Sequence, residues 1–267
     1  MSKKTVLTTL DEKFDVNRVI VSKATAHDIP NSNNLKYFRV YISYDNADGS
    51  QGNFVFATPR ESFTSGIVSN KNESDTTTGF SMPISLMGKD GYTQEQKNFI
   101  SAIKKIVKHV GDKCKSPDVR KVIKNSNHDA SIASMNPLKV RMNDEGEVDE
   151  SRGTSMYIKI YVKRDGSDLK VLTPLYKKDA FNPDGTPATY DISEVLGAYA
   201  LVYGAVRLES VYFGSGRASL QFKLVEVDME LLNGTRQRFI RHNQERSTPV
   251  VRAKSDGAEE LVLSDDD

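Results

Sequence analysis

The chain has 267 residues, of which 37% are hydrophobic and 27% are charged, a balance typical of a globular rather than a disordered protein. Its single cysteine, Cys114, excludes an intrachain disulfide and a zinc site built from cysteines, because both need more than one thiol. No segment has the ~18 consecutive apolar residues of a membrane-spanning helix, and the apolar part of the N-terminus is too short for a signal peptide. We therefore expect an intracellular protein with no membrane partner.

Acidic residues are concentrated at the C-terminus. Residues 255–267 carry six acids and no base, so the net charge of +1 for the whole chain becomes +7 for residues 1–254. A basic body with an acidic tail predicts a protein that binds a polyanion, with the tail competing for the same surface. The alternative is a disordered acidic end that only improves solubility. The tail residues expected to contact a partner are Glu259, Glu260, Asp265, Asp266 and Asp267.

Two strands are predicted near the N-terminus. Residues 35–44 alternate with a period of two, so that apolar side chains share one face of the strand. The opposite face consists of Tyr37, Arg39 and Tyr41. After a turn, residues 53–57 resume as a second strand, which predicts a hairpin. Residues 61–91 are rich in Ser, Thr, Asn and Gly, and we interpret them mainly as a long loop.

The clearest helix is predicted at residues 93–110. Thr93 can cap it together with Gln96, and apolar residues recur at the spacing of one helical face. Gly111 is expected to end it. The polar side is rich in lysine, and residues 93–124 carry nine bases against three acids. Such a surface is usually a solvated helix face, so alone it is weak evidence for nucleic-acid binding.

The second half of the chain is predicted to consist mainly of strands. Residues 155–164 alternate most clearly, and the face opposite the apolar one consists of Tyr157, Lys159, Tyr161 and Lys163. One hairpin is expected to turn at residues 165–168, and a longer one to join residues 199–213 to residues 219–231. The apolar positions of the last strand shift by one residue near Leu224 and Val225. This shift predicts a β-bulge, and such bulges help to coil a sheet into a barrel.

Catalytic and cofactor motifs do not occur in the sequence. The four histidines lack metal-ligand spacing, and Gly214 and Gly216 lie in a predicted hairpin without the pattern of a phosphate-binding loop. No nucleophile elbow is found, and the acids of residues 144–150 lie in a predicted loop, where solvation accounts for them. We therefore expect a binding protein that is not an enzyme and has no cofactor or metal.

Tyrosines and cations alternate on the two polar strand faces described above. Single-stranded nucleic acid is held by cations that follow the phosphates and by aromatic rings on which bases stack, each ring contributing ~1–3 kcal/mol per base. Both strands carry this combination, and the body of the chain is basic. The alternative is that the tyrosines cover a second small core and leave their hydroxyl groups in water.

Three segments carry a family resemblance: Thr-Ser-Met-Tyr-Ile-Lys-Ile-Tyr at residues 154–161, residues 197–213, and Gly-Arg-Ala-Ser-Leu-Gln-Phe-Lys-Leu-Val-Glu-Val at residues 216–227. In these, the sequence resembles the single-stranded DNA-binding proteins of T7-like phages and their counterparts in nucleocytoplasmic large DNA viruses. The resemblance implies one OB-fold, a Greek-key β-barrel, followed by an acidic tail. It also implies DNA contacts from a lysine on one strand and an aromatic residue near the end of the next long strand. By position these are Lys159 or Lys163, and Tyr212 or Phe213.

The sequence also departs from this family. It contains no tryptophan, so stacking falls to tyrosine and phenylalanine, and a basic stretch at residues 236–254 precedes the tail. The tail ends in Asp267 rather than in the aromatic residue that closes the phage tail. The expected organisation is a flexible start at residues 1–13, an OB-fold domain with long loops at 14–232, a basic extension at 233–254 and a disordered acidic tail at 255–267.

The expected function is non-sequence-specific binding of single-stranded DNA in viral DNA replication, recombination or repair. The resemblance places such a protein in a viral factory of the host cytoplasm, in the nucleus or in the virion. It implies replication proteins such as a DNA polymerase as partners of the tail. A second copy of the chain is a further candidate partner. The alternative is a virion structural or minor capsid-associated protein with no nucleic-acid role, and salt-dependent binding to oligonucleotides separates the two.

Overall fold

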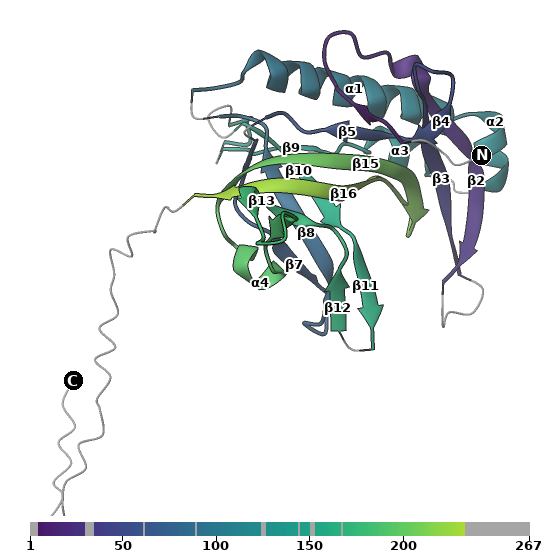
Figure 1. Ribbon diagram of the computed structural model, residues 1–267. Coiled ribbons are helices and arrows are strands. Elements are labelled where there is room, and N and C mark those ends of the chain that lie inside the picture. Colours follow the sequence, from purple (N-terminus) through teal and green to yellow (C-terminus); the bar gives the residue numbers. More distant parts are fainter. Residues whose placement is uncertain are drawn as a thin grey trace, which may run out of the picture. The chain divides into compact units, whose positions relative to one another are not determined.

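The fold is mainly β with one long helix, as the sequence predicted (Figure 1). The computed structural model describes residues 5–29, 35–60, 62–88, 90–123, 127–143, 145–149, 153–166 and 168–232, all within one compact unit. The basic extension and the acidic tail expected from the sequence lie outside the described residues. Within the described part of the chain, no helix has the length and apolarity that crossing a membrane requires.

Fourteen of the strands belong to one sheet. They are β1 (Leu7–Thr8), β2 (Val19–Asp28), β3 (Lys36–Asp45), β4 (Gln51–Asn53), β5 (Val55–Ala57), β6 (Ser62–Thr64), β7 (Val68–Lys71), β8 (Thr77–Ser85), β9 (Leu138–Val140), β10 (Thr154–Ile160), β13 (Leu175–Phe181), β14 (Pro187–Thr189), β15 (Ala200–Gly214) and β16 (Arg217–Leu231). A separate two-stranded sheet consists of β11 (Val162–Asp165) and β12 (Asp168–Val171).

Part of the large sheet closes into a ring. Strand β15 pairs with β6, β6 with β8, β8 with β10, β10 with β16, and β16 with β15 again. The β10–β16 pair is parallel and the other four are antiparallel. Strand β3 pairs with the C-terminal half of β15 and carries β2 on its other edge, so the sheet extends beyond the ring.

The long hairpin β15–β16 contains two bulges. Ala205 pairs with Glu226 and Val206 pairs with Leu224, so Val225 is the extra residue. This confirms the bulge that the shifted apolar pattern predicted. A second bulge, which the sequence did not reveal, leaves Glu209 without a partner between the Leu208–Phe222 and Ser210–Gln221 pairs.

Helix α1 (Gln94–Cys114) begins where the sequence predicted. Thr93 Oγ1 accepts a hydrogen bond from the Gln96 N–H at 3.2 Å, and Gln96 Oε1 accepts one from the Thr93 N–H at 2.9 Å. The helix continues past Gly111, which is buried against Ile132, so the expected end at Gly111 is wrong. A glycine inside a helix costs only about 1 kcal/mol, and close packing outweighs that cost.

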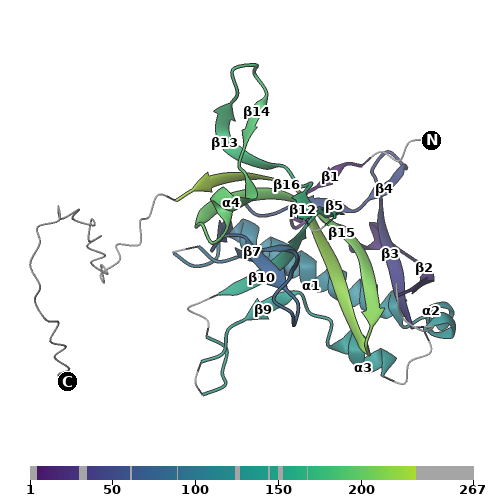
Figure 2. The same ribbon diagram turned by 90° about the horizontal axis from the view of Figure 1, so that it is seen from below.

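The apolar stripe of α1 packs on the core of the sheet. Phe99, Ile103 and Ile106 are buried, and the Phe99 ring lies 5.9 Å from that of Phe56 on β5. Figures 1 and 2 show α1 lying along one side of the sheet, with the β15–β16 hairpin beside it. The shorter helices are η1 (Val16–Arg18), α2 (Pro117–Val122), α3 (His128–Ala133) and α4 (Ile192–Val195).

Three expectations about element boundaries are corrected by the structure. Residues 61–91 contain β6, β7 and β8 rather than mainly loop, because the alternation of buried Met82 and Ile84 is masked in the sequence by polar neighbours and by Pro83. The expected strand at residues 155–164 is split at Tyr161, whose N–H donates to Thr173 Oγ1 at 3.0 Å. Residues 5–13, expected to be flexible, include β1 and the buried Leu10.

Candidate nucleic-acid interface

The strands β3, β15, β16 and β10 present a polar face on the side away from the core. Residues directly opposite each other in a ladder point to the same side of a sheet, so the register aligns their side chains in rows. One row runs from Arg39 through Tyr212 to Ser219, and another from Tyr41 through Ser210 to Gln221. A third row runs from Arg207 through Lys223 to Lys159.

We call this surface the outward face. It consists of Tyr37, Arg39, Tyr41, Tyr157, Lys159, Tyr161, Arg207, Glu209, Ser210, Tyr212, Ser219, Gln221 and Lys223. The structure therefore brings together the tyrosine and cation positions of two strands that lie more than 100 residues apart in the sequence.

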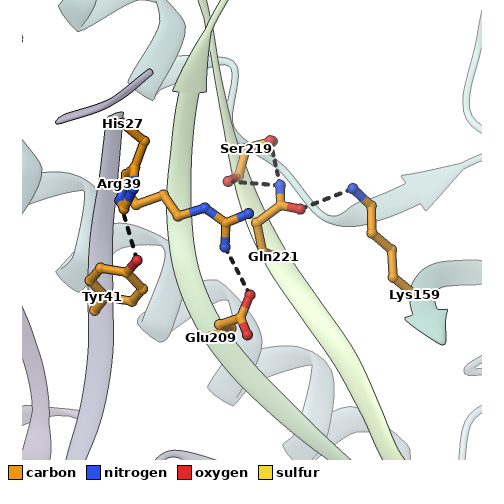
Figure 3. Close-up of polar contacts among 7 residues, drawn as sticks. All are labelled: His27, Arg39, Tyr41, Lys159, Glu209, Ser219 and Gln221. Atoms are coloured by element: carbon orange, nitrogen blue, oxygen red, sulfur yellow. Dashed lines mark hydrogen bonds and ion pairs between the residues drawn. The ribbon is translucent and has the colours of Figure 1, made fainter. Parts of the chain in front are cut away.

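Aromatic rings gather at the β3 end of the outward face. The Tyr37 ring stacks on His27 at 5.0 Å between centroids and lies 5.4 Å from the ring of Tyr212. The guanidinium of Arg39 lies 5.8 Å from the centre of the Tyr37 ring. Tyr41 is 39% exposed, and its hydroxyl lies 3.3 Å from Nε2 of His27 (Figure 3). This end offers ring faces and edges beside a positive charge.

Hydrogen bonds hold the cations in the centre of the outward face. Arg39 extends from β3 across β15, where its Nη1 lies 3.0 Å from Glu209 Oε2 (Figure 3). From the other side, Lys159 Nζ donates to Gln221 Oε1 at 2.9 Å, and Gln221 Nε2 donates to Ser219 Oγ at 2.7 Å. These cations are therefore oriented before any ligand arrives.

Burial lowers the pKa of Lys159 and of Lys223. The positive charges of Lys223 and Arg39 add to this effect at Lys159, while the Glu209 carboxylate opposes it at both lysines. Burial raises the pKa of Tyr161, which lies under Lys223 at 5.4 Å and hydrogen-bonds with Arg207. The outward face thus concentrates partly buried positive charge, and an anion placed there would meet weak solvent screening.

Tyr157 stands at the β10 end of the outward face and is 55% exposed. It lines a pocket together with Asn136, Lys139, Leu220 and Phe222 among other residues. An exposed ring next to a pocket with apolar and polar lining is a suitable platform for a flat heterocycle.

Two residues expected on this face lie elsewhere. Phe213 is only 4% exposed, pairs with Phe38 and stacks on His128 at 5.3 Å, because the register directs it to the core side. Tyr212 is therefore the aromatic residue at this point of the outward face, and Phe213 is excluded. Lys163 is exposed, but it lies in the separate β11–β12 hairpin opposite Lys170 and not in the large sheet.

Seven residues beside or within this site were not identified from the sequence. They are His27, Arg207, Glu209, Ser210, Ser219, Gln221 and Lys223. The alternation of β16 contained the signal for Gln221 and Lys223, which flank the buried Phe222. The position of Glu209 depends on the second bulge, which no apolar shift in the sequence marks. No group of three His, Cys, Asp or Glu side chains suited to a metal ion occurs in the described ranges.

Residues 12–267 match the family described as "Protein of unknown function (DUF2738)". The chain belongs to this family. The match includes every residue of the outward face and also the acidic tail, so both are part of the DUF2738 region. No curated protein matches the chain.

Proposed function

We propose that this DUF2738 protein binds single-stranded DNA, without sequence specificity, along the outward face. The observation that carries the proposal is the arrangement of tyrosines and partly buried cations in adjacent rows on β3, β15, β16 and β10. The strand-by-strand alternation in the sequence supports the same reading, and so does the resemblance to viral and phage single-stranded DNA-binding proteins.

In this proposal the cations and the rings divide the recognition between them. Arg39, Lys159 and Lys223 attract phosphates, and the hydrogen bonds of Arg39 and Lys159 reduce the entropy lost when the strand binds. Tyr157 and Tyr212 offer stacking surfaces, which accept any base because every base has a π face. Specificity for sequence would require donors and acceptors matched to base edges. The interaction that we propose is thus independent of base sequence. We also propose that it is stoichiometric binding, without catalysis or a cofactor.

We further propose that the ring of five strands is an OB-fold barrel. In chain order the ring strands are β6, β8, β10, β15 and β16, and around the ring they run first, second, third, fifth, fourth and back to first. This order, with the third and fifth strands parallel, suits a five-stranded Greek-key barrel. Oligonucleotide-binding barrels use the face of their second and third strands. The outward face shares the third of these, β10, and extends from it over β16, β15 and β3.

The biological setting follows from the resemblance. We propose a role in viral DNA replication, recombination or repair, in a viral factory of the host cytoplasm or in the nucleus, with packaging into the virion as a further destination. The acidic residues 255–267 would compete for the outward face and, when DNA displaces them, contact a replication protein such as a polymerase. Deleting them should then raise the affinity for single-stranded DNA at low salt, and the gain should shrink as salt screens the contact.

A titration of the purified chain with fluorescent oligo-dT at several salt concentrations tests the proposal. The logarithm of the binding constant should fall linearly with the logarithm of the salt concentration, by about 0.7 per phosphate neutralised on a single strand. A duplex of equal length should bind more weakly, because its bases are not available for stacking. Equal affinity for duplex, or a binding constant that salt does not change, would contradict the proposal.

One observation favours the rival function of a virion structural protein. Phe181, on the hairpin of β13 and β14, is 69% exposed, and Figure 2 shows this hairpin projecting from the rest of the described residues. A projecting apolar side chain is suited to contact another protein. If Phe181→Ser abolishes self-association while oligo-dT binding is absent from the wild-type chain, the structural role is the better account.

A further inference from the structure

The outward face carries one carboxylate among its cations, and its position is unusual. Glu209 is the extra residue of the second bulge, between Leu208, which is buried, and Ser210, which lies opposite Tyr41. A bulge allows consecutive residues to point to the same side of a sheet. The bulge therefore adds an acid to a face whose alternation would otherwise supply only neutral and positive side chains.

Glu209 holds the position that a phosphate would need. Its Oε2 lies 3.0 Å from Nη1 of Arg39, and the two side chains are only 17% and 27% exposed, respectively. Its negative charge also acts on Lys159 and Lys223, where it opposes the lowering of their pKa values by burial. One carboxylate is thus the shared counter-ion of three cations, which would otherwise repel one another.

Donors remain available around this carboxylate. Arg207 Nε and Ser210 Oγ are buried, and neither has a hydrogen-bond partner among the described residues. A buried donor without a partner costs about 1–3 kcal/mol, so a bound anion that accepted from it would recover part of that cost. The Glu209 carboxylate is bound to Arg39 and does not accept from either donor. A phosphate has more oxygen atoms and could accept from them as well as from Arg39.

We infer that Glu209 is a built-in substitute for a DNA phosphate, which keeps Arg39 in place in the free protein and is displaced from it when a strand binds. This inference rests on the proposed function. A guanidinium that donates to a carboxylate cannot give the same N–H groups to a phosphate. Binding therefore includes the cost of breaking this ion pair and of leaving the carboxylate beside a polyanion. A single small anion does not repay that cost, whereas a strand that delivers several phosphates and bases does.

Replacing Glu209 with glutamine tests the inference, because glutamine keeps the size of the side chain and removes its charge. In the oligo-dT titration, Glu209→Gln should bind at least about fivefold more tightly than the wild-type chain at low salt. Its salt dependence should steepen by about 0.7, because in the bound wild-type complex the Glu209 charge offsets one cation, whereas in the variant that cation neutralises one more phosphate. Inorganic phosphate should also compete with oligo-dT more effectively in the variant than in the wild type.

Glu230→Gln is the matched control. Glu230 lies near the C-terminal end of β16, the strand that pairs with β15, and outside the outward face, and its Oε2 lies 2.8 Å from Lys178 Nζ. The control removes the same charge, so it should change the affinity less than about twofold. Equal gains in both variants would mean that only the net charge matters, and would overturn the inference.

The remaining outcomes separate the inference from the proposed function. If the wild-type chain binds oligo-dT and Glu209→Gln shows no gain and no steeper salt dependence, the inference is wrong and the proposed function stands. Binding by the variant alone supports both, whereas binding by neither refutes both. Thermal unfolding reports whether each variant is folded. If Glu209→Gln is not, Glu209→Ala must show the same gain, and the Arg39 guanidinium NMR signals of the wild-type chain must shift on saturation with oligo-dT.

Discussion

Two cationic regions of the molecule differ in how they hold their charges. The outer side of α1 carries Lys97, Lys104, Lys105 and Lys108, all exposed, in the segment of the sequence with the largest local excess of bases. The outward face carries as many cations, but Arg39, Arg207 and Lys223 are half-buried, and Arg39 and Lys159 are held by hydrogen bonds. Because water and salt screen an exposed charge, exposed lysines attract a phosphate only weakly.

The number of charges in a stretch of sequence is therefore a poor predictor of where a ligand binds. The tyrosine nearest the outer side of α1, Tyr92, has its hydroxyl bonded to the backbone N–H of Thr154 at 2.8 Å. On the outward face, by contrast, rings and cations alternate from strand to strand. What distinguishes the two regions is therefore partial burial and aromatic neighbours, and the following experiments test that distinction.

The largest effect is expected from removing cations in pairs. Lys159→Gln together with Lys223→Gln should weaken oligo-dT binding roughly 100-fold at low salt, since a hydrogen bond to a charged group contributes about 1.5–3 kcal/mol. The salt dependence should fall by about 1.4, the value for two phosphates. The matched pair Lys104→Gln and Lys105→Gln on α1 should change affinity less than about threefold. Fluorescence anisotropy measures both, and equal losses would erase the distinction between the regions.

Single tyrosines come next. Tyr157→Ala and Tyr212→Ala should each cost about 1–3 kcal/mol of binding free energy, whereas the corresponding phenylalanine variants should cost little because the ring is kept. Tyr203 is the control, since it is 36% exposed and has Arg60 5.6 Å from its ring, but it lies opposite Asp228, outside the outward face. A loss for Tyr203→Ala as large as that for Tyr212→Ala would show that the face is misassigned.

A smaller effect is expected from Gly214, which contacts no proposed ligand. A Cβ atom at this position would lie 2.4 Å from the Tyr212 hydroxyl oxygen and 2.6 Å from Cζ, so Gly214→Ala must displace the ring. We expect a loss on the order of 1 kcal/mol in oligo-dT binding, part of the stacking contribution of Tyr212. Gly79→Ala on β8 is the control, because its Cβ would meet nothing closer than 3.9 Å.

The two regions should also differ in their response to alkaline pH. Burial lowers the pKa values of Lys159 and Lys223 below the ordinary 10.5, so these lysines lose their charge as the pH rises while exposed lysines keep theirs. Oligo-dT affinity should therefore decline at constant salt as the pH rises, beginning below the ordinary lysine pKa of 10.5. The doubly substituted Lys159→Gln, Lys223→Gln chain should show a flatter profile, and an identical decline in it would assign the titration to other groups.

The smallest effect concerns the inner side of α1. Burial raises the pKa of the Cys114 thiol to about 12, so the native chain should react with a thiol reagent at about pH 8 far more slowly than the unfolded chain. Cys114→Ala should leave oligo-dT affinity unchanged, because this side chain lies in the core. Rapid labelling of the native chain, measured by mass spectrometry, would show that α1 packs on the sheet too loosely to keep Cys114 buried.

Local patterns in the sequence were sufficient for several elements and for part of the candidate site. The alternation of residues 35–44 and 155–160 separated core side chains from outward ones, and the Thr93–Gln96 pair located the start of α1. The shift at Val225 predicted a bulge that the ladder contains. Each of these signals lies within a few residues, because side-chain periodicity and helix capping are properties of a short stretch of backbone.

The partners of each strand were decided only by the tertiary structure. Whether Tyr212 or Phe213 faces outward depends on the pairing of β15 with β3, and the end of β10 at Tyr161 depends on Thr173. The Arg39–Glu209 ion pair joins residues 170 positions apart and requires a bulge without a sequence signal. The sequence alone determined which side chains could share a face of one strand. Only the long-range register, chosen by packing of the whole core, determined which strands lie side by side and so which cations and rings meet.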